Sequence, residues 1–402
     1  MSYTLIDHRP AATEYLPPAP SARRDSGEFR SAIDSDTISG LVNGLVEYVS
    51  CSGYMFHPWQ IAAYVTAART KPFIILAGIS GTGKTKLPRL IAEATSATFE
   101  VIAVRPDWTD SGDVLGYRRL DDTFVPGPLL KAAHRAMGAP DQQHFVLLDE
   151  MNLARVEYYL AEVLSALEDR YRDSAGNLVS RSLLPAAGEA DGVDWGSVYW
   201  PPNLCLVGSV NMDETTHGFS RKVLDRAFVI EFSDIDLNAV PERTTPQVVP
   251  WPLQNWRQEF ASLGEFPKAD DAVVLNVIGT LNAVNEYLMP AQLQVGYRIR
   301  DEVALFCANA QANSDTFTSM DGQPVEPLDL AVSMKVLPRI QGGGSAIRSV
   351  LDALQTWSAG SSPDGSTDPG AETAQPAFPV SQKRITLMQQ RLDDNGFTSY
   401  WL

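Results

Sequence analysis

The stretch that decides the fold of this 402-residue chain is Gly78-Ile79-Ser80-Gly81-Thr82-Gly83-Lys84-Thr85. It fits the pattern G-x-x-x-x-G-K-[ST] of a loop that binds phosphate groups. The apolar run 73–77 before it predicts a buried strand, and residues 84–94 after it predict a helix. Strand, glycine-rich loop and helix therefore occur in the required order, which predicts an α/β fold with a parallel sheet between helices.

The residue types in this loop suit a nucleoside triphosphate and its magnesium ion. Glycines let backbone N–H groups turn inward around the β-phosphate, and the start of the following helix adds partial positive charge. Lys84 is expected to reach the β- and γ-phosphates and Thr85 to hold Mg²⁺. The alternative, a glycine turn that binds nothing, is disfavoured by the flanking strand and helix. The predicted nucleotide-binding residues are Gly78, Ser80, Gly81, Thr82, Gly83, Lys84 and Thr85.

A second motif follows about 65 residues later, where the apolar run 145–148 leads into Asp149 and Glu150. Adjacent acids at the end of a strand suit magnesium-assisted phosphoryl transfer. We expect Asp149 to hold the water shell of the ion and Glu150 to orient and deprotonate the attacking water. Any buried strand can end in acids as it reaches solvent. The pair therefore indicates a catalytic site only because the phosphate-binding loop precedes it in the chain.

Two further candidates lie downstream. The apolar run 204–210 leads into Asn211, where a polar side chain can position the lytic water beside the γ-phosphate. Arg226 comes just before another apolar strand, 228–232, and is the best candidate for an arginine finger that completes the site of a neighbouring subunit. The alternative for Arg226 is a structural ion pair with Asp225 or another acid.

Taken together, these motifs resemble the AAA+ nucleotidases. Within them they resemble the McrB-like group, the motor subunits of modification-dependent restriction systems, with MoxR-like ATPases as near relatives. The resemblance rests on segments 78–85, 148–155, 208–216 and 222–227, and it covers residues 40–357 and 381–401. It implies a P-loop AAA+ core with a helical lid subdomain. McrB has Asp where this chain has Glu214, which leaves ATP or GTP open as the substrate.

The resemblance also implies functional roles for two insertions and for one arginine of the lid. Segment 117–125 predicts a short hairpin, and segment 171–201 is rich in Gly, Asp and Ser; relatives carry pore-side hairpins at both positions. Both segments can also be plain surface loops. Arg298, in preference to Arg300, is implied as the lid arginine that senses the γ-phosphate. The alternative is an arginine at a helix start that pairs with Asp301 or Glu302.

Composition divides the chain into five segments. Segments 1–36 and 358–379 are poor in large apolar side chains and rich in Pro, Ser, Gly, Ala and Asp, so they are expected to be a disordered tail and a flexible linker. The predicted organisation is a tail at 1–36, a large α/β subdomain at 37–240, a helical lid at 241–357, a linker at 358–379 and a C-terminal helix at 380–402.

The remaining expectations concern location and partners. The three cysteines lie far apart, and we find no long apolar run or export signal, so we expect a cytoplasmic protein without a membrane span. The net charge of −17 disfavours a broad DNA-binding surface. The resemblance to the McrB-like group implies a homo-oligomeric, hexameric ring that drives or activates a McrC-like nuclease, and the charge leads us to expect that DNA is contacted indirectly or through the pore. The rivals are a MoxR-like remodelling ATPase acting on a protein client and a slow, nucleotide-switched scaffold.

Overall fold

A mostly parallel sheet forms the centre of the computed structural model, which describes residues 13–16, 37–212, 217–235, 237, 243–268, 270–360 and 376–401. The strand order is β1-β3-β6-β11-β2-β12, and all pairs are parallel except that of β1 with β3. The strands are β1 (Thr13–Leu16), β2 (Phe73–Gly78), β3 (Thr98–Ala103), β6 (His144–Asp149), β11 (Leu204–Asn211) and β12 (Phe228–Glu231).

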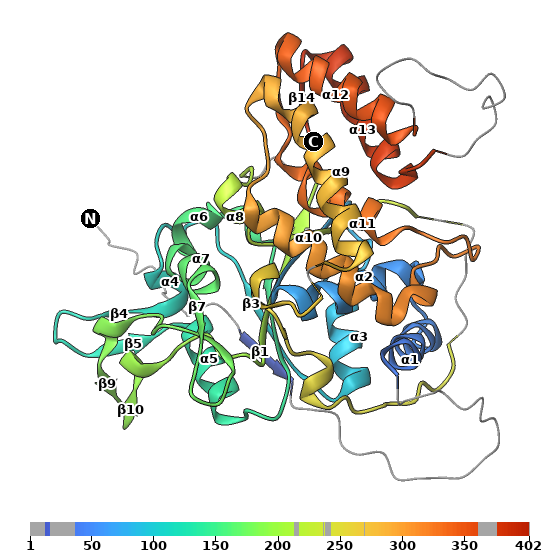
Figure 1. Cartoon of the computed structure of the whole chain (residues 1–402). Coiled ribbons are helices and arrows are strands. Elements are labelled where there is room, and N and C mark those ends of the chain that lie inside the picture. Colours follow the sequence, from blue (N-terminus) through green and yellow to red (C-terminus); the bar gives the residue numbers. More distant parts are fainter. Residues whose placement is uncertain are drawn as a thin grey trace, which may run out of the picture.

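The central strands are continuous apolar runs because both faces of the sheet are covered by helices. Every residue of β2 is buried. Helices α1, α2 and α3 lie on one side of the sheet, and α5 and α7 lie on the other (Figure 1). This arrangement confirms the predicted α/β fold class. The helices of this part are α1 (Ile38–Cys51), α2 (Pro58–Thr70), α3 (Lys86–Thr95), α4 (Gly112–Leu115), α5 (Pro128–Gly138), α6 (Val156–Tyr159), α7 (Ala161–Glu168) and α8 (Arg221–Leu224).

The edge strand β1 lies inside segment 1–36, which the sequence predicts to be a disordered tail. Thr13–Leu16 pairs antiparallel with β3, so the expectation is wrong for these four residues. The physical reason is that β3 would otherwise leave an edge of unpaired N–H and C=O groups, which can pair with any extended segment. The rest of segment 1–36 lies outside the described residues.

The two insertions form small hairpins that contact each other. In the first, β4 (Gly116–Arg118) pairs with β5 (Phe124–Pro126), close to the range 117–125 predicted for a hairpin. In the second, β7 (Arg170–Arg172) pairs with β8 (Leu178–Ser180), and β9 (Glu189–Ala190) pairs with β10 (Val193–Asp194). Arg118 donates from its guanidinium to the carbonyl of Ala187, at 2.9 Å. The hairpins lie together at one side of the sheet (Figure 1).

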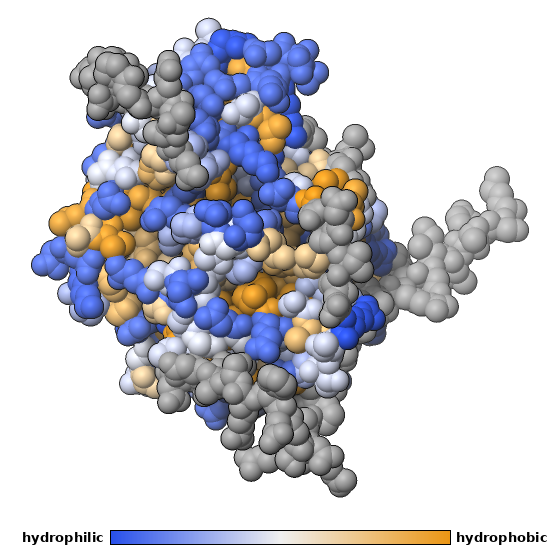
Figure 2. Space-filling model, turned by 90° about the vertical axis from the view of Figure 1, so that its right-hand side faces the viewer, coloured by the Kyte–Doolittle hydropathy of each residue, from blue (hydrophilic) through white to orange (hydrophobic). Residues whose placement is uncertain are grey.

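Helices build the remainder of the chain. The segment predicted as a lid contains α9 (Ala272–Leu288), α10 (Tyr297–Ala310), α11 (Pro327–Lys335) and α12 (Gly344–Ser358), and it is followed by α13 (Pro379–Asn395). A two-stranded sheet of β13 (Gln341–Gly343) and β14 (Phe397–Ser399) ties the end of the chain to this bundle. The upper part of the molecule, where α12 and α13 lie, is largely hydrophilic on the face shown in Figure 2. The lid helices therefore turn their apolar sides inward.

The start of α13 is fixed to the lid by a buried carboxylate. Asp329 accepts hydrogen bonds from the main-chain N–H groups of Val380 (2.7 Å) and Ser381 (2.9 Å). These groups have no partner within the helix, and an anion at a helix start is favourable. Burial raises the pKa of Asp329, although the same hydrogen bonds lower it. Residues 361–375 of the predicted linker, and 238–242 around the predicted boundary at 240, lie outside the described residues.

One segment of the lid is long and apolar enough to cross a membrane, although the sequence predicts no membrane span. Within the described residues it is 272–291, which contains α9. Its buried side chains recur at helical spacing and face the bundle: they are Val274, Val277, Leu281, Val284 and Leu288. Asn285 also bonds to both main-chain groups of Val295. This is the pattern of an amphipathic helix packed on its neighbours.

The lid is joined to the sheet by a buried cluster of charges. Glu302 of α10 is 4% exposed and pairs with Lys335 of α11 (2.6 Å) and with Lys71, which comes just before β2 (3.3 Å). Burial would raise the pKa of Glu302, but the two lysines outweigh burial and lower it. A buried carboxylate shared by two ammonium groups tolerates little displacement of either, because separation leaves an uncompensated charge. The lid and the beginning of β2 are therefore held together here.

Candidate functional site

The glycine-rich loop lies between the end of β2 and the start of α3. Gly81 and Gly83 have φ angles of 82° and 87°, in the left-handed region that favours glycine. At Gly83 a second constraint applies, because an added Cβ would lie 2.8 Å from Cζ of the Phe56 ring. The backbone of the loop therefore depends on glycine both for its turn and for its packing.

Lys84 is directed into the curve of this loop. Lys84 is only 5% exposed. Its ammonium group donates hydrogen bonds to the carbonyl oxygens of Gly78, at 3.0 Å, and of Ile79. An ammonium group held in this way is already largely removed from water. It is thus placed as a compact positive charge inside the turn that would surround a phosphate group.

Thr85 and Asp149, the two predicted magnesium ligands, lie in contact. The Thr85 hydroxyl donates to Oδ1 of Asp149 at 2.9 Å, although the residues are 64 positions apart. The contact forms because β2 and β6 are both neighbours of β11 and end at the same edge of the sheet. Mg²⁺ is commonly held by one or two protein oxygens together with phosphate oxygens and waters, so this donor pair fits the ion.

Glu150 and Asn211 extend the same chain of contacts. The Glu150 backbone is left-handed, with φ 52° and ψ 48°, which is unfavourable for a residue with a side chain and is typical of functional sites. Its N–H donates to the Ser209 hydroxyl (2.9 Å), which donates to Oδ1 of Asp149 (2.6 Å). The Asn211 amide donates to a carboxylate oxygen of Glu150 at 3.4 Å. The four predicted residues Thr85, Asp149, Glu150 and Asn211 are thus brought together.

Ser209 was missed by the sequence analysis. Its hydroxyl fixes both the Asp149 side chain and the Glu150 main chain, so it sets the position of the acids. The available signal was its position two residues before Asn211 in an otherwise apolar strand, which places both side chains on the same face of the sheet.

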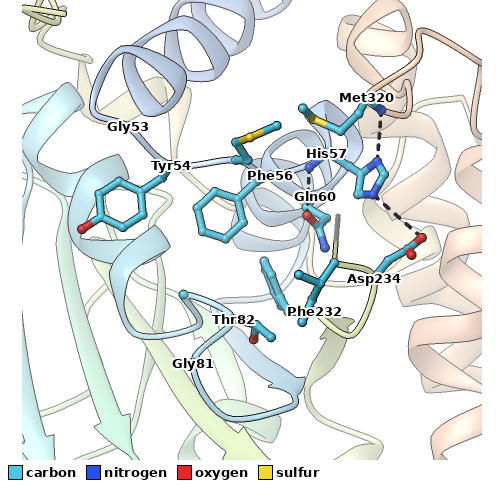
Figure 3. Close-up of a pocket in the computed structure, with 13 residues that line it drawn as sticks. Gly53, Tyr54, Phe56, His57, Gln60, Gly81, Thr82, Phe232, Asp234 and Met320 are labelled. Carbon is cyan, nitrogen blue, oxygen red and sulfur yellow. Dashed lines mark hydrogen bonds and ion pairs between the residues drawn. The ribbon is translucent and has the colours of Figure 1, made fainter. Parts of the chain in front are cut away.

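A cavity of about 460 Å³ opens beside the loop (Figure 3). Tyr54 and Phe56 bring aromatic rings to it, and His57 and Asp234 face each other with Nε2 and Oδ2 3.9 Å apart. Nδ1 of His57 accepts from the N–H of Met320 at 3.1 Å. Burial lowers the pKa of His57, although Asp234 acts in the opposite direction. The cavity is also lined by Gly53, Met55, Gln60, Gly81, Thr82, Gly83, Phe232 and Ile235.

This cavity offers what a nucleotide base needs next to its phosphates. Aromatic and apolar surface can cover a planar ring, and a few polar groups can fix its orientation. Because Nδ1 of His57 accepts a hydrogen bond, its neutral form carries the hydrogen on Nε2, so the pair presents a donor from His57 and an acceptor from Asp234. No short motif in the sequence indicated His57 or Asp234, which come from segments far apart in the chain.

The two predicted arginines lie elsewhere, on one shared carboxylate. Arg226 is 14% exposed; its Nε donates to the carbonyl of Leu164 at 3.0 Å, and its guanidinium pairs with Glu168. Arg298 pairs with the other oxygen of Glu168. Arg300, the alternative for the lid, pairs with Asp301 at 2.6 Å. Of the two lid candidates, Arg298 is therefore the one that reaches the core of the same chain.

The strand register separates Arg226 from the loop of its own subunit. Phe228 at the start of β12 lies opposite Ile74, and Glu231 at its end lies opposite Ala77. Arg226 precedes β12, so it lies at the edge where β2 begins, whereas the loop starts at Gly78 at the other edge. Six residues at about 3.3 Å each separate the two levels by about 20 Å. Arg226 therefore does not reach a nucleotide bound in its own loop.

Comparison with protein families gives two matches along the chain. Residues 73–228 match the AAA domain of the dynein-related subfamily. Residues 248–397, which include the lid helices and all of α13, match a domain of unknown function, DUF8727. The first match spans the glycine-rich loop, both acids, Asn211 and Arg226. Together with the contacts among Thr85, Asp149, Glu150 and Asn211, it supports an AAA+ ATPase of the P-loop class.

Proposed function

We propose that the chain is a magnesium-dependent nucleoside triphosphatase that works as a ring-forming motor. The observation that carries the proposal is the continuous set of contacts from Thr85 through Asp149 and Ser209 to Glu150 and Asn211. A metal-binding pair next to a water-activating pair is the arrangement that hydrolysis needs, whereas binding alone would not require the second pair.

Each residue has a separate task in the proposed reaction. The loop N–H groups and Lys84 bind the phosphates, and Thr85 and Asp149 would hold Mg²⁺, which neutralises developing charge on the phosphate oxygens. Glu150 accepts the proton of the attacking water. Asn211 keeps the Glu150 carboxylate in place through the 3.4 Å contact and lies where it can also orient the water.

Magnesium dependence is the first expected result. Phosphate release with ATP or GTP should fall to background when EDTA removes the ion, because Thr85 and Asp149 carry no positive charge and act on the phosphates only through the ion that they hold. Asp149→Asn should lower release by about 10² or more, since it removes the only charged metal ligand of the pair. The measurement is steady-state phosphate release with each nucleotide over a Mg²⁺ titration. Release that is unchanged in EDTA would contradict the assignment.

The cavity beside the loop can accept the base of either ATP or GTP. Adenine presents an amino donor beside a ring-nitrogen acceptor, and guanine presents a carbonyl acceptor beside ring and amino donors. The donor of His57 and the acceptor of Asp234 suit either edge. The ratio of kcat/KM for the two nucleotides, compared between the wild type and Asp234→Asn, tests whether this pair selects the base.

For the biological role, we propose that the ring drives or activates an associated McrC-like nuclease in restriction of foreign DNA. The support is the resemblance of segments 78–85, 148–155, 208–216 and 222–227 to the McrB-like group. Residues 213–216 of the third segment lie outside the described residues. The test is co-purification of the chain with the product of a neighbouring nuclease gene, together with DNA cleavage that requires nucleotide turnover.

One observation favours the second candidate, remodelling of a protein client. Hairpin 117–125 holds two arginines and two aspartates, and segment 171–201 holds two arginines and four acids, so neither insertion is basic. At the first hairpin Tyr117 and Leu120 are exposed. Binding to a DNA backbone depends on basic side chains, whereas a neutral hairpin with exposed apolar side chains, such as the first, suits a polypeptide. Stimulation of turnover by unfolded protein but not by duplex DNA would favour this candidate.

A further inference from the structure

Glu168, the last residue of α7, bridges two arginines that come from different parts of the chain. Oε2 of Glu168 pairs with Arg226, which follows α8, and Oε1 pairs with Arg298, in the first turn of α10. One carboxylate thus joins the predicted arginine finger to the predicted lid sensor. No motif pointed to Glu168, and it has no role in the contacts around the glycine-rich loop.

This bridge lies at the edge of the sheet opposite to the glycine-rich loop. Lys71, which comes just before β2, donates to the carbonyl of Leu167 at 3.1 Å, so the end of α7 reaches the beginning of β2. Lys71 also pairs with Glu302, one helical turn after Arg298. Arg298 is therefore held with Arg226 away from the nucleotide site of its own subunit.

The lid also forms hydrogen bonds and an ion pair with the segment that carries Arg226. Lys335 of α11 donates to the carbonyl oxygens of Asp225 (3.1 Å) and Ala227 (2.9 Å), on both sides of Arg226. Arg339 pairs with the Asp225 carboxylate at 2.9 Å. Any displacement of the lid would therefore displace Arg226 as well. The two arginines are linked through Glu168 and through the main chain of 225–227.

The charges of the bridge suit an anion supplied from outside. Two guanidinium groups this close would repel each other, and the carboxylate between them removes that repulsion. The set keeps one net positive charge, and the side chains of Arg298 and Glu168 remain 36% and 37% exposed. Arg226 is more buried and is oriented by the carbonyl of Leu164. Guanidinium groups ordered in this way are suited to phosphate oxygens.

We propose that Glu168 is a positioning residue that holds Arg226 and Arg298 as one two-arginine unit, which acts on the nucleotide bound by the neighbouring subunit. The inference rests on the proposed function, because it needs a nucleotide site that two subunits share. It adds a role for Glu168: the shared carboxylate fixes the two arginines relative to each other, so that lid position and finger position become one variable.

The first test is Glu168→Gln, which keeps the shape of the side chain and removes its charge. Turnover should fall by about tenfold or more, and by no more than the factor of about 10³ to 10⁵ that a finger contributes, while KM changes by less than about threefold. The matched control is Glu162→Gln, an exposed acid in the first turn of the same helix, which should keep wild-type turnover. Wild-type turnover by Glu168→Gln would overturn the proposal.

The second test uses mixed oligomers, because a merely structural role would not depend on the partner. Glu168→Gln mixed with Glu150→Gln should exceed the weighted mean of the two, since one interface then combines an intact Glu150 with an intact arginine unit. Glu168→Gln mixed with Arg226→Ala should not, because every interface lacks an intact unit. Turnover above the weighted mean in both mixtures, or in neither mixture, would overturn the proposal.

Arg298→Ala gives an independent variant that leaves Glu168 in place. It should reproduce both mixing results, because the unit needs both arginines. Recovery of Arg298→Ala with Arg226→Ala would show that the two arginines serve different sites, and would overturn the proposal. Wild-type turnover by Arg226→Ala itself would remove the shared site and with it the ring-forming part of the proposed function, while the assignment of nucleotide hydrolysis would stand. A defective Arg226→Ala beside a normal Glu168→Gln would overturn the role of Glu168 alone.

Discussion

Lys84→Ala is expected to abolish nucleotide binding, whereas Glu150→Gln is expected to leave binding intact and to stop hydrolysis. The ammonium group of Lys84 lies in the curve of the loop, 3.0 Å from the Gly78 carbonyl, where it would contact phosphate oxygens directly. Charge-assisted hydrogen bonds contribute about 1.5 to 3 kcal/mol each, so losing two weakens binding by about a hundredfold or more.

Glu150 differs from Lys84 because it acts on water. General-base catalysis contributes about 10² to 10⁴ in rate, and glutamine cannot accept the proton. The amide keeps the size of the side chain and one oxygen for the Asn211 contact, so the site should still assemble around the nucleotide. The variant should therefore accumulate as a nucleotide-bound, assembled ring.

The measurement is binding of a fluorescent nucleotide followed by phosphate release on the same samples. The control is Lys131→Ala, which replaces an exposed lysine of α5 and should change neither quantity. Full turnover by Glu150→Gln would remove Glu150 as the water-activating acid. Retained binding by Lys84→Ala would remove the loop as the phosphate site.

Arg226→Ala is expected to lose hydrolysis while it keeps nucleotide binding. The strand register puts Arg226 about 20 Å from the loop of its own subunit, so its own nucleotide does not need it. An arginine finger contributes about 10³ to 10⁵ in rate. A fall of less than about tenfold would instead indicate that Arg226 serves only its ion pair with Glu168.

Mixing identifies the subunit on which Arg226 acts. Arg226→Ala supplies an intact Glu150 and Glu150→Gln supplies an intact finger, so their mixture should exceed the weighted mean of the two. The measurement is phosphate release across mixing ratios, with mixed oligomers confirmed by mass. Arg221→Ala, an exposed arginine five residues earlier, is the matched control and should keep wild-type turnover. Mixtures that never exceed the mean would remove Arg226 from the shared site.

The core of the fold could be predicted from sequence because its signals are local. The apolar run 73–77, the glycine-rich loop and the helix after it are neighbours in the chain, and β2 and α3 form there. The strands before Asp149 and Asn211 were predicted in the same way. Parallel strands that share one edge then bring their end residues together, which explains the Thr85, Asp149, Glu150 and Asn211 contacts.

The features that were missed depend on contacts between distant segments. Glu168 and Arg298 are 130 positions apart, and neither segment contains a pattern that points to the other. The cavity beside the loop joins Tyr54–His57 to Asp234 and Met320, again without a motif. Strand β1 forms in a composition typical of a tail because an unpaired sheet edge can pair with short, otherwise undistinguished segments.

The central claim is that each nucleotide site is completed by a neighbouring subunit. The most direct measurement is phosphate release per subunit, recorded with oligomer mass over a dilution series at saturating Mg²⁺ and nucleotide. We predict that release per subunit falls steeply as the assembly dissociates, because an isolated subunit keeps its own Glu150 but lacks a neighbour's Arg226. A monomer that hydrolyses nucleotide at the rate of the assembled form would contradict the claim.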